Sequence, residues 1–239
     1  MAKAKDIYVA PIKAADANRI IKRLHYSKSH TQNSQLHLGV FLDGRLEGAM
    51  QFGPSIDKRK MLGIVEGAKW NDFIELNRMA FSEKLPRNSE SRAIGVAIRI
   101  IKKQYSHIKW IVSFADGTQC GDGTIYRASG FVLTSIKKNT SIWEAPDGKV
   151  ATDLSLRLGK QKPIINSTTM TKGKAIQKTG AASMQPFKDA GYKRKLGFQL
   201  RYIYFIDPQA KQNLNCEELP YSKIGEMGAG MYLGNKREK

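Results

Sequence analysis

Short apolar stretches separated by amphipathic ones run along most of the chain, and they predict strands alternating with helices. Alternation on both sides of Asp43-Gly44 predicts a β-hairpin with a type I′ turn, because this turn favours Asp followed by Gly. Apolar positions at helical spacing predict helices over 14–24 and from 88 or 89 to 105. Strands are expected at 7–12, 36–42, 46–52, 73–81, 111–115, 132–138, 141–144 and 198–206, with a loop over 53–67.

The stretch from Lys109 to Phe131 combines a strand, a polar glycine-rich loop and a short helix. The apolar residues of 111–115 predict a strand covered on both faces, which stops at Asp116-Gly117. The glycines that follow allow backbone N–H groups to approach a ligand. Polar groups at the carboxyl end of a buried strand, next to a helix start, are where open α/β sheets bind ligands. We therefore expect an active site in this stretch.

The order of these elements resembles the Gcn5-related N-acetyltransferase superfamily over 7–138. The resemblance implies an α/β fold with a central mixed, twisted sheet flanked by helices. In that superfamily a helix start holds the pyrophosphate of an acyl-coenzyme A, and a tyrosine before a Gly-Phe pair lies near the thioester. RNSESRAIG and Tyr126 in TIYRASGF match these positions, although Asn-Ser-Glu-Ser replaces the usual glycine-rich loop. We expect one acetyltransferase-like domain over 1–206 and a tail of unknown role over 207–239.

The charge of the chain indicates a polyanionic partner, because 40 Lys and Arg against 21 Asp and Glu leave a net charge of +19. Eleven basic residues and a single acidic residue, Asp189, lie between 154 and 201. We expect 154–197 to be a basic insertion for nucleic-acid contact, placed before the last strand; the alternative is a basic surface that only confers solubility. The expected DNA-binding residues are Lys58, Arg59, Lys60, Lys172, Lys174, Lys193, Arg194 and Lys195.

The cysteines and the lengths of the apolar runs indicate the cellular compartment of the protein. The two cysteines, Cys120 and Cys216, form no disulfide framework or CxxC motif, which fits a reducing compartment. No apolar run approaches the roughly 18 residues that cross a bilayer, and the first residues lack a secretory signal. We expect a soluble cytoplasmic protein without a membrane partner.

Several longer strings resemble the Mom family of phage DNA modification proteins. They are HYSKS, NSQLHLGVFLDGRLEGAMQFGPS, ELNRMAFS, LPRNSESRA and VSFADGTQCGDGTIYRASGF, and they cover most of 20–145. The resemblance implies a transferase that converts adenine in double-stranded phage DNA to its N6-carbamoylmethyl derivative, which protects the DNA from restriction nucleases in the host bacterial cytoplasm. The positions that match imply a site containing His25, Tyr26, Arg78, Ser91, Asp116 and Tyr126.

Chemistry suggests roles for these residues. The adenine amine is a weak nucleophile and is paired inside the duplex, so the base must be extruded or already unpaired. We expect Asp116 to accept or hold the amine proton, Tyr126 to donate to the leaving group, and Tyr26 to contact the base, with His25 as a fourth catalytic residue. The anionic part of the donor is expected at Arg78, Arg87, Asn88, Ser89, Ser91 and Arg92.

Alternatives stay open for several of these assignments. His25 could stabilise a helix end, Asp116 could cap a turn, and Cys120 could be a nucleophile. The donor could be acetyl-CoA or another coenzyme A thioester, or an activated glycine such as glycyl-tRNA. The resemblance also suggests iron, for which no ligand spacing is visible. The competing functions are an ordinary acyl-CoA-dependent N-acetyltransferase acting on a small molecule or protein, and a non-catalytic DNA-binding protein.

Overall fold

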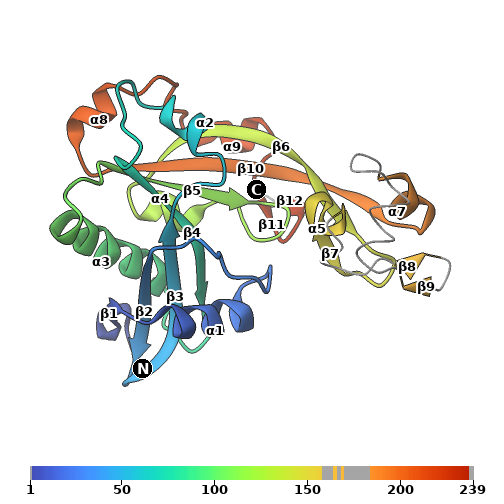
Figure 1. Cartoon of the computed structure of the whole chain (residues 1–239), viewed down its shortest axis with the longest axis horizontal. Helices are drawn as coiled ribbons and strands as arrows, with labels where there is room; N and C mark the ends of the chain where they lie inside the picture. The colour runs from blue at the N-terminus through green and yellow to red at the C-terminus, as the bar shows by residue number, and fades with distance from the viewer. Residues whose placement is uncertain (1, 158–163, 166–167, 170–183, 237–239) are drawn as a thin grey trace.

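A computed structural model describes residues 2–157, 164–165, 168–169 and 184–236 of the chain (Figure 1). The main sheet of this part has eight strands in the order β1-β2-β3-β4-β5-β10-β6-β7. In chain order these strands are β1 (Tyr8–Pro11), β2 (Leu36–Leu42), β3 (Arg45–Gly53), β4 (Phe73–Phe81), β5 (Trp110–Asp116), β6 (Val132–Glu144), β7 (Val150–Thr152) and β10 (Lys193–Phe205). Two small antiparallel pairs join β8 (Ile164–Ile165) to β9 (Thr168–Thr169), and β11 (Met231–Tyr232) to β12 (Asn235–Lys236).

Helices accompany the sheet on both faces. They are η1 (Ala4–Asp6), α1 (Ala14–Leu24), α2 (Lys58–Leu62), α3 (Ser89–Gln104), α4 (Thr124–Ala128), α5 (Asp153–Arg157), α7 (Gln185–Asp189), α8 (Pro208–Gln212) and α9 (Ser222–Glu226). The buried face of α3 packs in one cluster with Met50 and Leu76, whereas α1 packs with Ala49 and Ala80. Because neighbouring residues of a strand point to opposite faces, α1 and α3 cover opposite sides of the sheet. The expected mixed sheet flanked by helices is confirmed.

The hairpin of β2 and β3 is the element that the sequence predicts best. Leu42 pairs with Arg45, and the two residues between them, Asp43 and Gly44, have φ values of 48° and 74°. Positive φ at both central positions is the geometry of a type I′ turn, as predicted.

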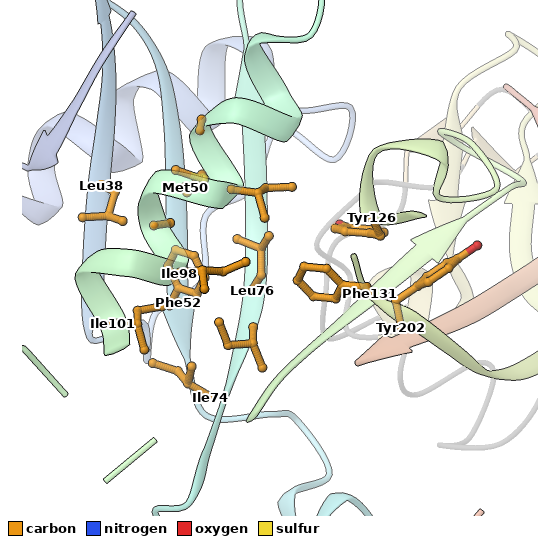
Figure 2. Close-up of a cluster of buried hydrophobic side chains, with 14 of the residues drawn as sticks. Leu38, Met50, Phe52, Ile74, Leu76, Ile98, Ile101, Tyr126, Phe131 and Tyr202 are labelled. Carbon is orange, nitrogen blue, oxygen red and sulfur yellow. The ribbon is translucent and has the colours of Figure 1, made fainter. Parts of the chain in front are cut away.

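The strands β4 and β5 form the parallel pair of the sheet, and they separate after three paired positions. Phe73 pairs with Trp110, Ile74 with Ile111 and Glu75 with Val112. Beyond these positions β4 stays paired with β3, and β5 stays paired with β10. Figure 1 shows β4 running down the view while β5 runs across it. Figure 2 shows Leu76 of β4 on one side and Tyr126, Phe131 and Tyr202 on the other, all within one buried cluster.

Three expectations about local structure are wrong. The helix α2 lies within the predicted loop over 53–67, and a single strand, β6, replaces the two strands expected at 132–138 and 141–144. The strand β10 begins at Lys193, so Lys193, Arg194 and Lys195 belong to the sheet and not to an insertion. The outer half of β10 pairs with the outer half of β6, where Trp143 is buried in a second cluster with Phe187 and Tyr192, while Lys193 and Arg194 keep their side chains exposed.

Gly123 offers a test of how tightly the loop before α4 is held. Its φ is +85°, and a Cβ at this position would collide with the ring of Tyr202. Gly123→Ala should therefore lower the free energy of unfolding by about 3 kcal/mol, measured by urea denaturation. Gly225→Ala is the matched control, since nothing lies within 4 Å of its Cβ position in α9, and it should be neutral or slightly stabilising. Equal stability of the two variants would contradict this packing.

Candidate active site

A cavity of about 730 Å³ opens where β4 and β5 separate. Its walls are the ends of both strands, the glycine-rich loop, α4, the end of α1, the segment 55–57 and the tail segment 232–233. The predicted residues His25, Tyr26, Arg78, Asp116 and Tyr126 all line this cavity. The structure thus gathers five of the expected site residues, from four separate segments of the chain.

Asp116 organises the start of the glycine-rich loop. Its Oδ1 accepts hydrogen bonds from the backbone N–H of Thr118 at 2.9 Å and from the side chain of Asn139 at 3.3 Å. Its Oδ2 accepts a bond from the side chain of Gln119 at 3.2 Å. These bonds show that the turn-capping role of Asp116 is present.

The second half of the loop is held by a buried ion pair. Asp122 is 4% exposed, and its Oδ1 lies 3.3 Å from the guanidinium of Arg127. The hydroxyl of Tyr202 donates a 2.6 Å hydrogen bond to the backbone carbonyl of Asp122. These contacts tie the loop to both α4 and β10, so the loop presents a defined surface to the cavity.

The tail completes the cavity wall, a role that the sequence did not predict. Tyr232 forms a β-bridge with Gly121, and the N–H of Leu233 donates to the carbonyl of Cys120 at 2.8 Å. The N–H of Gly234 donates to the carbonyl of Gly117 at 3.0 Å. Tyr232 and Leu233 line the cavity. The one available signal was an aromatic-aliphatic pair between glycines in the segment GAGMYLGN.

His25 lies buried at the end of α1, with a defined tautomer. Its Nδ1 accepts a hydrogen bond from the backbone N–H of Ser27 at 3.1 Å, so the neutral ring carries its proton on Nε2. Burial, followed by the positive charges of Arg78 and Lys28, lowers the pKa of His25 to about 4. The imidazole is therefore neutral at physiological pH, which argues against the alternative role as a positive charge at a helix end.

Tyr26 stands next to His25 at the cavity, with their ring centroids 4.1 Å apart. The residue keeps 44% of its surface exposed, yet the surrounding protein, and then the charge of Asp116, raise the pKa of its hydroxyl well above the usual range. Tyr26 is thus a neutral aromatic surface that is partly open to solvent.

Two further groups in the cavity have shifted proton affinities. Burial raises the pKa of Tyr126 to about 12, and the nearby hydroxyl of Ser113 partly offsets this effect. Burial also raises the pKa of Glu75, although Ser55 and Asn77 act in the opposite direction. Glu75 is not among the residues expected from the sequence; its place in the cavity follows from the separation of β4 and β5. A raised pKa makes a carboxylate a stronger base.

Cys120 lines the cavity beside these groups. Desolvation, and then the charge of Asp116, raise the pKa of its thiol. Because the thiolate is the nucleophilic form, this environment disfavours the alternative in which Cys120 is a nucleophile.

The start of α3 is arranged differently from the expectation. The side chain of Ser89 is buried and donates to the carbonyl of Pro86 at 2.6 Å, and that of Ser91 donates to the carbonyl of Asn88 at 3.2 Å. The guanidinium of Arg92 bonds the carbonyl of Lys5 at 3.3 Å. None of the expected donor-binding residues Arg87, Asn88, Ser89, Ser91 and Arg92 lines the cavity, whereas Glu90 does. Donor binding at these five residues stays a prediction.

Arg78 does reach the cavity, but its donors are partly engaged. Its Nε donates to the carbonyl of Ser29 at 3.1 Å, and one terminal nitrogen donates to the carbonyl of Asn77 at 2.7 Å. Arg78 therefore braces the segment after α1 against β4 and places its positive charge at the cavity wall.

The expected DNA-binding residues fall into two described groups. Lys58, Arg59 and Lys60 form the first turn of α2, directly after cavity-wall residues. Lys58 lies over the ring of Trp70 at 4.7 Å, and Lys60 pairs with Asp57 at 2.7 Å. Lys193, Arg194 and Lys195 lie on β10, where Lys195 approaches Glu144 at 3.7 Å. Lys172 and Lys174 lie outside the described residues.

In the described ranges no three His, Cys, Asp or Glu side chains gather closely enough to hold a metal ion, so they offer no ligand set for iron. No helix in the described part of the chain combines the length and the apolar character needed to cross a membrane.

The mixed sheet carries a strand-end cavity lined by groups with shifted proton affinities, which marks an enzyme active site, and similarity to a methylcarbamoylase makes the enzyme a transferase. The chain belongs to the Mom protein family, whose model matches residues 6–223. It is 31% identical over 226 residues to the methylcarbamoylase Mom of Escherichia phage Mu, a match that covers 92% of this chain and 85% of the relative. The family resemblance seen in the sequence is confirmed.

The chain is also similar to solved acetyltransferases, at low TM-scores. The acetyltransferase of Bacillus subtilis in complex with CoA has a TM-score of 0.41 and 11% identity, with 84% of this chain and 97% of that chain covered. The ribosomal-protein-S18-alanine N-acetyltransferase of Escherichia coli has a TM-score of 0.43 and 10% identity, with 84% and 94% covered. These likenesses concern the arrangement of elements alone.

The buried neutral state of His25 has a consequence for stability. The pKa in the folded protein, about 4, is below the ordinary value of 6.5, so between these values the unfolded chain binds more protons. Stability should therefore fall as the pH is lowered from 7 to 5, with His25 contributing about 2 kcal/mol to the loss. Urea denaturation at pH 7 and at pH 5 should show that the free energy of unfolding of His25→Asn falls by about 2 kcal/mol less than that of the wild type. His107→Asn, at an exposed site, should follow the wild type; identical pH dependence in all three proteins would contradict the assignment.

Proposed function

We propose that this Mom-family transferase attaches a carbamoylmethyl group to N6 of adenine in double-stranded phage DNA, and that the modification protects the DNA from host restriction nucleases. Its place of action is then the host bacterial cytoplasm, where phage DNA is copied. The observation that carries the proposal is the cavity between β4 and β5, in which an aromatic surface and a carboxylate of raised pKa face one space in a chain of this family.

The cavity has the size and chemistry to receive an extruded base. Its volume, about 730 Å³, is within the range of small-molecule sites. Tyr26 offers a neutral aromatic face at which a base can stack, and the Nε2–H of His25 can donate to a ring nitrogen of adenine. Stacking and hydrogen bonding of this kind offset part of the cost of extruding the base, which is roughly a few kcal/mol.

The proton of the amine requires an acceptor as the new bond forms. We assign this role to Glu75, because burial raises its pKa, and assign to Asp116 the positioning of the glycine-rich loop, because its carboxylate accepts three hydrogen bonds. Tyr126 keeps its proton at neutral pH and can donate it to the leaving group. Arg78 supplies positive charge for an anionic part of the donor.

The atoms of the carbamoylmethyl product limit which donors can supply it. A carbamoylmethyl group contains an amide nitrogen, which an acetyl group lacks, so acetyl-CoA alone cannot supply the group. A glycyl group has the same atoms as a carbamoylmethyl group but is joined through its carbonyl carbon. An activated glycine, such as glycyl-tRNA, therefore accounts for all the atoms when the adenine amine displaces the tRNA hydroxyl and the transferred group then isomerises, so that N6 ends bonded to the methylene carbon and the glycine nitrogen to the carbonyl carbon. We therefore favour an activated glycine over a coenzyme A thioester as the donor.

Positive side chains near the cavity suit a DNA partner. The first turn of α2, with Lys58, Arg59 and Lys60, follows the cavity wall, and the net charge of the chain is +19. The basic residues of β10 and of the segment that contains Lys172 and Lys174 would extend this contact along the phosphate backbone. Such contacts position the duplex without reading its sequence.

Expression in a bacterium tests both the reaction and the donor. Nucleosides from digested host DNA should contain a carbamoylmethyl deoxyadenosine by mass spectrometry. Isotope-labelled glycine in the medium should label its carbamoylmethyl group, measured as label in excess of that in unmodified deoxyadenosine of the same digest, because glycine also enters the purine ring. Unmodified deoxyadenosine alone, with the protein soluble and folded, would overturn the proposed function. Label entering from acetate and not from glycine would overturn the donor assignment alone.

The base assignment has its own test, in a bacterial extract that supplies the donor to purified protein. Glu75→Gln should lower the rate of adenine modification by about 100-fold or more. The wild-type rate should fall as the pH is lowered through the raised pKa of Glu75, since only the carboxylate accepts a proton. The exposed Glu83, outside the cavity, provides the control Glu83→Gln, which should match the wild type. A normal rate in Glu75→Gln would assign the base elsewhere.

A further inference from the structure

Ile56 is the most exposed large apolar side chain of the described residues, with 96% of its surface open to solvent. It lies at the cavity wall, between Ser55 and Asp57, which also line the cavity. An isoleucine in this position gains nothing from burial in the free protein. Its exposure at the cavity wall therefore indicates a bound partner that covers it.

The segment that carries Ile56 is anchored on both sides. Ser55 is buried, and the side-chain amide of Asn77 donates to the carbonyl of Pro54 at 3.4 Å. Asp57 caps α2 by accepting a hydrogen bond from the backbone N–H of Lys60 at 3.2 Å, and Met61 buries the helix against the protein. Ile56 thus projects from a fixed base and not from a free loop.

The charge around Ile56 indicates what covers it. The next three residues are Lys58, Arg59 and Lys60 after the capping Asp57, and Arg59 and Lys60 are exposed. A cationic border of this kind complements the phosphates that flank a residue entering a nucleic acid, and the segment lies at the wall of the cavity proposed to receive a base. The apolar tip and the basic turn together fit a DNA duplex.

We propose that Ile56 is a wedge that enters the base stack of duplex DNA and fills the space that the target adenine leaves when it is extruded into the cavity. The inference rests on the proposed function and extends it to the mechanism of extrusion. An apolar side chain that occupies the vacated space stabilises the unstacked state and slows the return of the base. Tyr26 would contact the extruded base in the cavity, while Ile56 occupies the space that the base leaves in the duplex.

The wedge is required only where the target base is stacked and paired, and this gives a selective test. Purified wild type and Ile56→Ala are compared in a bacterial extract that supplies the donor, on a DNA duplex and on one of its strands alone. Ile56→Ala should reduce the initial modification rate about tenfold on the duplex and leave the rate on the single strand within about twofold. Ile56→Leu, which keeps an apolar tip, should restore most of the duplex rate.

Control variants and opposite outcomes complete the test. Met227→Ala removes an exposed apolar side chain outside the cavity and should match the wild type on both substrates. A truncation at so exposed a site leaves stability within about 0.5 kcal/mol, so urea denaturation should not distinguish Ile56→Ala. An equal loss on both substrates, or no loss on either, overturns the wedge. If the wild type modifies neither the duplex nor the single strand, the proposed function itself is overturned.

Discussion

The separation of β4 from β5 is the constraint on which the site depends. Two parallel strands that remain paired leave no space between them, whereas here pairing ends at Glu75 and Val112 while both strands continue. Each strand keeps its outer neighbour, so the sheet remains one body. Glu75, at the last paired position of β4, lines the cavity that opens there. The sheet therefore provides both the stability of the core and the opening for chemistry.

The cavity is held in shape by contacts between segments distant in sequence. Asp116 ties the beginning of the glycine-rich loop, the Asp122–Arg127 pair ties its end, and the tail hairpin adds backbone hydrogen bonds to its middle. Gly123 allows the ring of Tyr202 to approach the loop closely. A transferase benefits from such an arrangement, because catalytic groups act best when they are already in place before the substrate arrives.

Local patterns predicted much of the fold, and long-range pairing explains most of what they missed. The β2–β3 hairpin, α1 and α3 follow from turn chemistry and helical spacing, which are properties of neighbouring residues. His25, Tyr26, Arg78, Asp116 and Tyr126 came from a family resemblance, and the structure places them around one cavity. Tyr232 and Leu233 escaped notice because a two-residue strand has no detectable period. The role of Glu75 depends on where two strands stop pairing, which the sequence of either strand does not record.

The tail hairpin has a consequence for the order in which the protein is made. Residues 231–234 follow all the other segments of the cavity wall along the chain, so they leave the ribosome after them. The core sheet, including β10, can form while these residues are still inside the ribosomal tunnel. The cavity gains its last wall only after they emerge. A chain truncated before this hairpin would therefore carry the fold without a complete cavity.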